Sequence, residues 1–299
     1  MKKIQSLLQQ KKIRFAHAMS AEPEPKKNIL PSSPISISLY TKQRRDRQPN
    51  MQKTLPFLII QLRPEDETSD GEYEAFLRYG GIHPNEVVRI RAERGGLPTI
   101  DLSNFSAIIV GGSPFNVSER EEAKSPLQKK IEADFHHLLV QIVEQDFPFL
   151  GCCSGSGLLG SYLGGTVSTR FPESVGGVDI ILTEDGRNDP LLKDMPPKIR
   201  VLLGHKESNE HCPPGAVLLA YNEQCPVSMF RVKQNVYATQ FHPEGDVDGF
   251  KVRIMVYKGH GYFPEADADK LIEAIEGEET PEAQAILRRF VQRYRRTMS

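Results

Sequence analysis

Cysteine is scarce in this sequence: there are four among 299 residues, and none forms a C-x-x-C pair with another. The eight histidines add no combination with a metal-ligand spacing. These absences leave no indication of a zinc site or of a disulfide framework. Free thiols suit a reducing compartment, so we expect a cytoplasmic protein with no bound metal.

Long apolar runs are missing as well. None approaches the ~20 residues that a membrane-spanning helix needs. The apolar section within Met1–Leu8 is too short for a secretory signal and breaks at Gln9-Gln10-Lys11-Lys12. We therefore expect neither membrane insertion nor secretion.

The whole chain has almost no excess of either charge, with a net charge of −1, but its two parts differ strongly. Residues 1–50 contain eleven Lys and Arg against three Asp and Glu, which leaves −9 for the remainder. An acidic body argues against a nucleic-acid-binding core. The basic segment has no periodicity and is rich in Lys, Arg, Pro, Ser and Gln, so we expect a disordered extension over 1–50. Its role, as a plain tail or as a partner-binding arm, stays open.

From residue 51 onward, short apolar strands alternate with amphipathic helices. The longest helical stripe contains Leu127, Ile131, Phe135, Leu138 and Ile142. The alternation is typical of an α/β fold, a three-layer sandwich in which helices cover both faces of a mostly parallel central sheet. Between residues 167 and 241, strands follow one another with short polar turns, which predicts a smaller antiparallel section. We place the folded domain at 51–263 and a charged helical tail at 264–299.

The most informative stretch is an apolar strand that runs into Gly151-Cys152-Cys153-Ser154-Gly155. The G-x-C-x-G pattern is typical of a nucleophile elbow, a tight strand-to-helix turn that needs small residues on both sides of its apex. Cys153 then stands at a helix N-terminus, where unpaired N–H groups favour the nucleophilic thiolate. Cys152 is expected to be a core residue, because its attack would break the register of the motif.

A second motif, His242-Pro243-Glu244, follows the apolar segment Tyr237–Phe241. Proline forces His242 into an extended conformation, and side chains two apart on an extended segment share a face. His242 and Glu244 are thus arranged as a base and the acid that orients it. Together with Cys153 they make up a cysteine-based catalytic triad.

With a third segment, Ile108–Ser113, these motifs resemble the class I (triad-type) glutamine amidotransferases. The resemblance covers roughly residues 54–263 and is strongest to stand-alone domains related to the glutaminase part of GMP synthase. It implies the flavodoxin-like class I fold. It also implies an oxyanion hole made of the backbone N–H groups of Gly112 and Ser154.

One position departs from the family pattern. The family usually has a substrate-holding glutamine four residues after the nucleophile, where this chain has Gly157. Either another residue holds the substrate, or glutamine is not the preferred substrate. The resemblance places Ser113, Gly157 and His205, the last within Gly204–Ser208, at the substrate.

The resemblance implies a glutaminase that releases ammonia from glutamine through a thioester and needs no cofactor. The ammonia would pass to an unidentified acceptor or to a synthetase partner protein. Two alternatives remain open: a γ-glutamyl hydrolase or peptidase with the same triad, and a non-catalytic regulatory subunit on the same scaffold.

Overall fold

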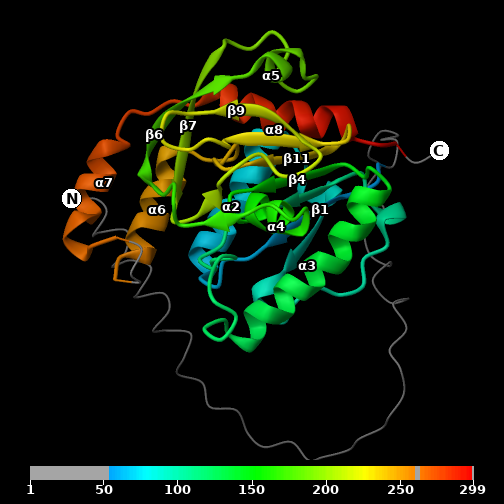
Figure 1. Cartoon of the computed structure of the whole chain (residues 1–299), viewed down its shortest axis with the longest axis horizontal. Helices are drawn as coiled ribbons and strands as arrows, with labels where there is room; N and C mark the ends of the chain where they lie inside the picture. The colour runs from blue at the N-terminus through cyan, green and yellow to red at the C-terminus, as the bar shows by residue number, and fades with distance from the viewer. Residues whose placement is uncertain (1–53, 260–262, 298–299) are drawn as a thin grey trace, which may run out of the picture. The chain divides into compact units, whose positions relative to one another are not determined.

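The structure is a computed structural model that describes residues 54–259 and 263–297 (Figure 1). The extension expected at residues 1–50 lies outside the described residues. None of the helices in the described ranges combines the length and the apolar character needed to cross a membrane.

Five strands form the parallel half of a nine-stranded sheet, in the order β2-β1-β3-β4-β11. They are β1 (Phe57–Gln61), β2 (Val87–Arg91), β3 (Ile108–Val110), β4 (Phe149–Cys152) and β11 (Val236–Thr239). All but β2 are buried along their whole length, which explains their continuous apolar sequences. Because the strands are parallel, the residues that follow them meet at one edge of the sheet, where ligands bind in open α/β folds.

Four further strands continue the same sheet beyond β11, in the order β10-β9-β6-β7, and all of these pairings are antiparallel. They are β6 (Glu173–Leu182), β7 (Lys198–His205), β9 (Ala216–Tyr221) and β10 (Met229–Val232). A separate two-stranded sheet pairs β5 (Val167–Ser168) with β8 (Ser208–Asn209). The predicted parallel sheet with an antiparallel section is confirmed, and most of that section extends the central sheet.

Helices cover both faces of the parallel half (Figure 1). Side chains alternate along β1, so that Leu58 and Ile60 join one core cluster while Phe57 and Ile59 join another. The first cluster includes residues of α3 (Pro126–Glu144) and α4 (Ser154–Tyr162), and the second includes residues of α2 (Asp66–Gly80) and α8 (Pro281–Tyr294). This arrangement confirms the three-layer sandwich.

Shorter helices complete the described chain. They are α5 (Glu184–Asn188), α6 (Val247–Tyr257), α7 (Ala268–Ala274) and the 3-10 turns η1 (Pro84–Glu86), η2 (Ala92–Arg94), η3 (Leu102–Asn104) and η4 (Glu265–Asp267). α6 begins directly after the His242-Pro243-Glu244 motif and is capped by Asp246, whose side chain accepts a hydrogen bond from Gly249 N–H. This cap fixes where α6 starts relative to the motif.

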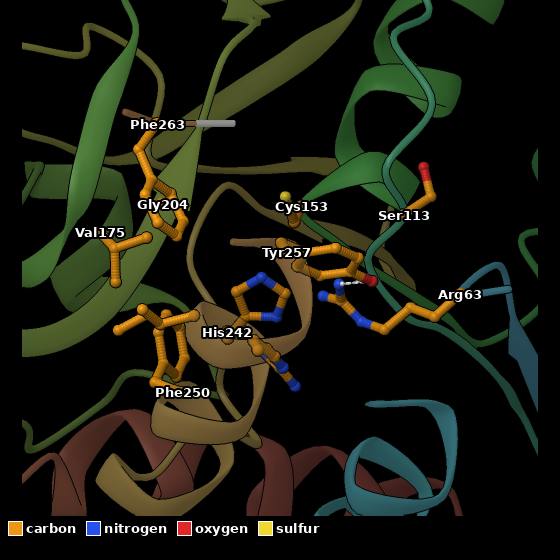
Figure 2. A pocket seen from close by; sticks show the side chains of 11 residues that line it. Arg63, Ser113, Cys153, Val175, Gly204, His242, Phe250, Tyr257 and Phe263 are labelled. Atoms are coloured by element: carbon orange, nitrogen blue, oxygen red, sulfur yellow. Dashed lines mark hydrogen bonds between the residues drawn. The ribbon is translucent and has the colours of Figure 1, made fainter. Parts of the chain in front are cut away.

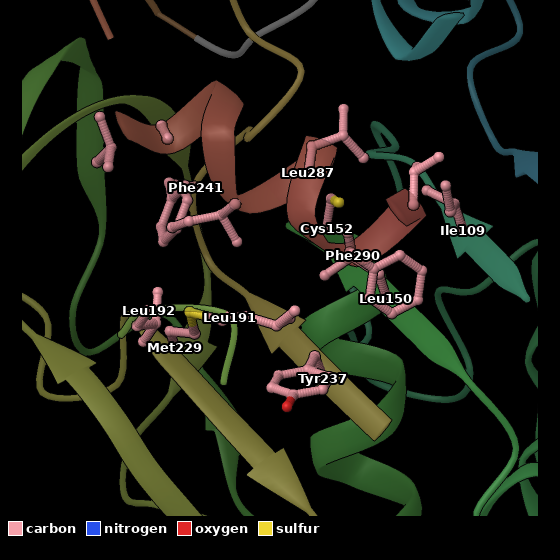
Figure 3. Packing of buried hydrophobic residues seen from close by; sticks show 14 of the residues in the cluster. Ile109, Leu150, Cys152, Leu191, Leu192, Met229, Tyr237, Phe241, Leu287 and Phe290 are labelled. Atoms are coloured by element: carbon pink, nitrogen blue, oxygen red, sulfur yellow. The ribbon is translucent and has the colours of Figure 1, made fainter. Parts of the chain in front are cut away.

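The segment after residue 263, expected to be a charged helical tail, contributes α8 to the main core. One face of α8 is buried, through Ala283, Ile286, Leu287, Phe290 and Val291. Figure 3 shows Leu287 and Phe290 near Leu150 and Tyr237, two strand residues of the same cluster. α8 thus forms part of one helical layer of the sandwich.

Candidate active site

Cys153 lies at the turn between β4 and α4, in the N-cap position of the helix. Its backbone has φ 53° and ψ −98°, a conformation that residues other than glycine rarely adopt. The turn has no room for larger neighbours, since a Cβ on Gly151 would lie 2.7 Å from backbone atoms of Gly155. This is the tight strand-to-helix turn expected from the G-x-C-x-G pattern. Cys152, in contrast, is fully buried in the core.

His242 and Glu244 follow β11, which pairs with β4 so that Thr239 lies opposite Cys152. The His242 Nδ1 atom lies 2.7 Å from Glu244 Oε1. Both side chains are buried, and the rings of His242 and Phe250 are nearly perpendicular, with their centroids 5.5 Å apart. The carboxylate fixes the orientation of the imidazole and leaves Nε2 for another partner.

The Cys153 thiol and the His242 ring line one pocket, whose apolar wall includes Val175, Phe250 and Phe263 (Figure 2). Within the described ranges, neither the Sγ atom of Cys153 nor the Nε2 atom of His242 has a hydrogen-bond partner. The fold therefore brings the two groups to one cavity with their reactive atoms unoccupied. Contacts of this kind often tighten only when substrate binds.

Burial sets the protonation states of these residues. It is the main cause that raises the pKa of the Cys153 thiol to about 11, against the opposing charges of Arg63 and Arg253. Burial likewise lowers the pKa of His242. Burial alone would raise the pKa of Glu244. The contact with His242 and the charge of Arg253 outweigh it and lower the pKa to about 2. With a pKa of about 11 the resting Cys153 thiol is neutral, whereas the helix N-terminus alone predicted a thiolate.

The turn after β3, Gly111-Gly112-Ser113, has all three of its backbone N–H groups bonded to acceptors within the protein. Gly111 N–H donates to a β1 carbonyl at 3.0 Å. Gly112 N–H donates to Glu72 Oε1 at 3.1 Å, and Ser113 N–H donates to Ser154 Oγ at 2.8 Å. The Gly112 N–H, expected in the oxyanion hole, thus points to a buried carboxylate.

The other expected donor, the Ser154 N–H, begins α4 next to Cys153. It donates to no acceptor in the described part of the chain. Unpaired N–H groups are normal in the first turn of a helix. Of the two expected donors, only this one, next to Cys153, is without an acceptor among the described residues.

A buried charged network that the sequence did not indicate lies beside His242 and Glu244. Arg63 Nε lies 2.8 Å from Glu72 Oε1, and Arg63 Nη1 donates to Tyr257 Oη at 3.1 Å. Arg253 Nη2 lies 3.0 Å from Glu244 Oε1 and 3.8 Å from Glu72 Oε1. The one available signal was the place of Arg63 just after β1, at the edge of the sheet where sites form.

A second pocket also borders Cys153 and contains the three expected substrate contacts, Ser113, Gly157 and His205. A Cβ on Gly157 would lie 3.7 Å from Glu207 Oε1, so Glu207 faces the position of the missing glutamine. The Glu207 carboxylate accepts two backbone N–H bonds from residues 117 and 118, at 2.7 and 2.8 Å. Glu207 was not singled out in the sequence, although it belongs to the Gly204–Ser208 motif.

Two sets of buried side chains bring potential metal-ligand atoms within 4.8 Å of one another. They are Glu72, His242 and Glu244, and Glu173, His205 and Cys225. Each set contains a hydrogen-bonded His–Glu pair, with His205 Nε2 2.8 Å from Glu173 Oε2 in the second. The spacing in the sequence indicated neither set.

Comparison with known proteins identifies the family. Residues 77–256 match the profile of the family described as "Glutamine amidotransferase class-I". The chain is 32% identical over 169 residues to one subunit of the glutamine-hydrolyzing GMP synthase of Pyrococcus abyssi, a match that covers 56% of this chain and 79% of that protein. It is 29% identical over 148 residues to the glutamine-hydrolyzing GMP synthase of Borreliella burgdorferi, covering 50% of this chain. The match spans only 26% of the Borreliella protein.

Solved structures show the same fold. A glutamine amidotransferase from Thermotoga maritima has a TM-score of 0.64 at 22% identity, covering 80% of this chain and 98% of that chain. The profile match includes more than half of the 299 residues and contains Cys153, His242 and Glu244. This chain therefore belongs to the class I glutamine amidotransferases and is similar to the glutaminase part of GMP synthases.

Proposed function

We propose that this chain hydrolyses the side-chain amide of glutamine and releases ammonia, with Cys153, His242 and Glu244 as the catalytic triad. The observation that supports this most is the shared pocket, where Sγ of Cys153 and Nε2 of His242 are both unoccupied within the described ranges. The buried contact between His242 and Glu244 supplies the orientation that a general base needs.

The first half of the reaction forms a thioester. Nε2 of His242 takes the thiol proton of Cys153 as Sγ bonds to the amide carbon. The Ser154 N–H stabilises the developing oxyanion. His242 then gives its proton to the amide nitrogen, the C–N bond breaks, and ammonia leaves.

The second half regenerates the thiol. A water molecule gives a proton to His242 as its oxygen bonds to the thioester carbon. The C–S bond then breaks, glutamate leaves, and Cys153 recovers the proton from His242. Since thiol and imidazole are both neutral at rest, proton transfer accompanies attack in this scheme.

A second candidate is a γ-glutamyl hydrolase or peptidase, favoured by Gly157 in place of the usual glutamine. Glu207 faces that position. We propose that Glu207, with Ser113 and His205 in the same pocket, takes over contact with the amino-acid part of the substrate. The α-ammonium group, common to glutamine and γ-glutamyl peptides, is a suitable partner for its carboxylate.

Ammonia from such a site needs an acceptor, and we propose a separate synthetase partner in the cytoplasm. The Pyrococcus relative carries the name of a GMP synthase subunit, which supports this division of labour. Free thiols suit a reducing compartment such as the cytoplasm.

An assay of ammonia release from glutamine, run beside cleavage of a γ-glutamyl dipeptide, tests the proposal. Wild type should release ammonia, and Cys153→Ala should lose both activities. Cys152→Ala is the matched control and should keep wild-type turnover, because Cys152 is fully buried in the core.

The alternatives have distinct outcomes. Cleavage of the dipeptide without ammonia release from glutamine would favour the peptidase. Inactivity on both substrates, together with failure of a thiol-directed glutamine analogue to label Cys153, would favour a regulatory subunit.

A further inference from the structure

The Gly111-Gly112-Ser113 turn has no free backbone N–H group with which to stabilise an oxyanion in the pocket. The N–H groups of Gly111, Gly112 and Ser113 all donate to acceptors within the protein. Pro114, which follows, has no N–H. Ser154 N–H is therefore the remaining candidate among the expected donors, whereas a tetrahedral oxyanion is usually held by two.

The Arg63 guanidinium lies directly against Gly112. A Cβ on Gly112 would lie 2.5 Å from Arg63 Nη2 and 2.8 Å from the Cε1 atom of His242. Arg63 lines the same pocket as Cys153 and His242, and Figure 2 shows its guanidinium directed toward the imidazole. A donor group thus stands at the turn whose own amide points elsewhere.

Two of the three guanidinium nitrogens are held by neighbours. Nε bonds to Glu72 and Nη1 to the hydroxyl of Tyr257. The third, Nη2, donates to no acceptor within the described ranges. The side chain is only 6% exposed, so its position is fixed by packing and by two bonds while one donor nitrogen stays unused.

The two glycines of the turn are explained by the space that neighbouring side chains need, and not by hydrogen bonding of their N–H groups to an oxyanion. A Cβ on Gly111 would lie 2.3 Å from Glu72 Oε2, and one on Gly112 would strike Arg63. Both glycines therefore make room for the Arg63–Glu72 pair. The pair is built into the turn at the place where an oxyanion donor is needed.

We infer that Arg63 is an oxyanion donor of this site, with Nη2 acting in place of the Gly112 amide. The inference rests on the proposed thioester chemistry at Cys153. A charged donor bonds an anion more strongly than a neutral amide does, and a donor already fixed by Glu72 and Tyr257 needs no rearrangement during the reaction. The positive charge of Arg63 also acts to lower the pKa of the Cys153 thiol, against the burial that raises it.

Steady-state kinetics of Arg63→Met, with whichever γ-glutamyl substrate wild type accepts, tests this inference. Loss of a donor used only in the transition state should lower kcat by about 100-fold and change KM by less than about threefold. Because Arg63→Met removes the nearer of the two cations beside the buried Glu72, Arg63→Met/Glu72→Gln is measured too and should show the same loss of kcat. Arg231→Met is the matched control, since Arg231 forms a 2.8 Å ion pair with the buried Asp189. Its kcat should stay at the wild-type level.

Chemical rescue separates an oxyanion donor from a structural residue. Guanidinium ion at millimolar concentration should raise the kcat of Arg63→Ala and leave Arg231→Met unchanged. Wild-type kcat in the double variant, or a defect in KM alone, would overturn the inference while the thioester mechanism stands. If wild type turns over no γ-glutamyl substrate, the proposed function itself fails.

Discussion

Backbone strain at Cys153 shows how single residues shape this site. A positive φ at a non-glycine residue costs ~1–3 kcal/mol and persists only where the surroundings impose it. Here Cys153 N–H donates to Thr239 O at 2.7 Å, and the neighbouring glycines allow close approach of the chain. The turn thus depends on small residues that have no chemical role of their own.

Gly151→Ala should therefore impair the site. Its new Cβ would lie 2.7 Å from backbone atoms of Gly155, so the turn must shift. We expect a loss of ~1–3 kcal/mol in the free energy of unfolding, together with a clear fall in kcat, measured by urea denaturation and the ammonia assay. Gly71→Ala is the control. Its Cβ would meet nothing within 4 Å, and in α2 it should stabilise by ~0.5–1 kcal/mol.

The lowered pKa of His242 predicts the pH dependence of activity. A protonated imidazole cannot accept the thiol proton, so kcat/KM should fall on the acid side. Burial moves the pKa below its ordinary value of 6.5, which places the midpoint of this fall below pH 6.5. Glu244, with a pKa of about 2, stays ionised over the whole range. A pH profile of kcat/KM checks this, and a midpoint at or above pH 6.5 would contradict it.

Among the elements, α6 matters because it follows the His242-Pro243-Glu244 motif and carries Arg253, which contacts Glu244 at 3.0 Å. Its N-terminus is fixed by Asp246. The carboxylate accepts from Gly249 N–H at 2.7 Å and from the Tyr79 hydroxyl at 2.6 Å. This cap links α6 to α2 next to the proposed triad.

Asp246→Ala should cost ~1–2 kcal/mol of unfolding free energy, the usual effect of losing a helix N-cap. Because α6 positions Arg253 against Glu244, we also expect a lower kcat. Ser125→Ala removes the N-cap of α3, where Ser125 Oγ accepts from Gln128 N–H at 3.1 Å. It should cost similar stability with unchanged kcat, measured by thermal denaturation beside the activity assay. Equal losses of kcat in both variants would argue against a role of α6 in positioning.

For the whole molecule, α8 is a structural part of the sandwich. Phe290 is fully buried and its ring lies 6.4 Å from that of Tyr237, centroid to centroid. Phe290→Ala should lower the free energy of unfolding by ~3–5 kcal/mol, as urea denaturation would show. Arg288→Ala, on the exposed face of the same helix, should change it by less than ~0.5 kcal/mol.

The parts that could be predicted from the sequence are those with a local pattern. Continuous apolar strands and a helical stripe such as Leu127–Ile142 indicate the layered fold, and two short motifs mark Cys153 and His242. The network of Arg63, Glu72 and Arg253 has no such pattern. Arg63 follows β1, Glu72 lies in α2 and Arg253 lies in α6, so only the folded chain brings the three side chains together.

The protonation state of Cys153 could not be predicted from the sequence for a related reason. The helix N-terminus, a local feature, predicted a thiolate, whereas enclosure by the whole fold raises the pKa to about 11. The same holds for the Gly112 N–H, which donates to Glu72 from α2, an element distant in the sequence. Local patterns thus marked Cys153 and His242 as candidates but did not indicate the surroundings that set their pKa values.

Acid-quenched mass spectrometry of the wild-type protein during turnover of its substrate tests the central claim most directly. The account predicts a γ-glutamyl adduct on the peptide that carries Cys153, kept in Cys152→Ala and absent in Cys153→Ala. Turnover that continues in Cys153→Ala, or an adduct that disappears in Cys152→Ala instead, would contradict it.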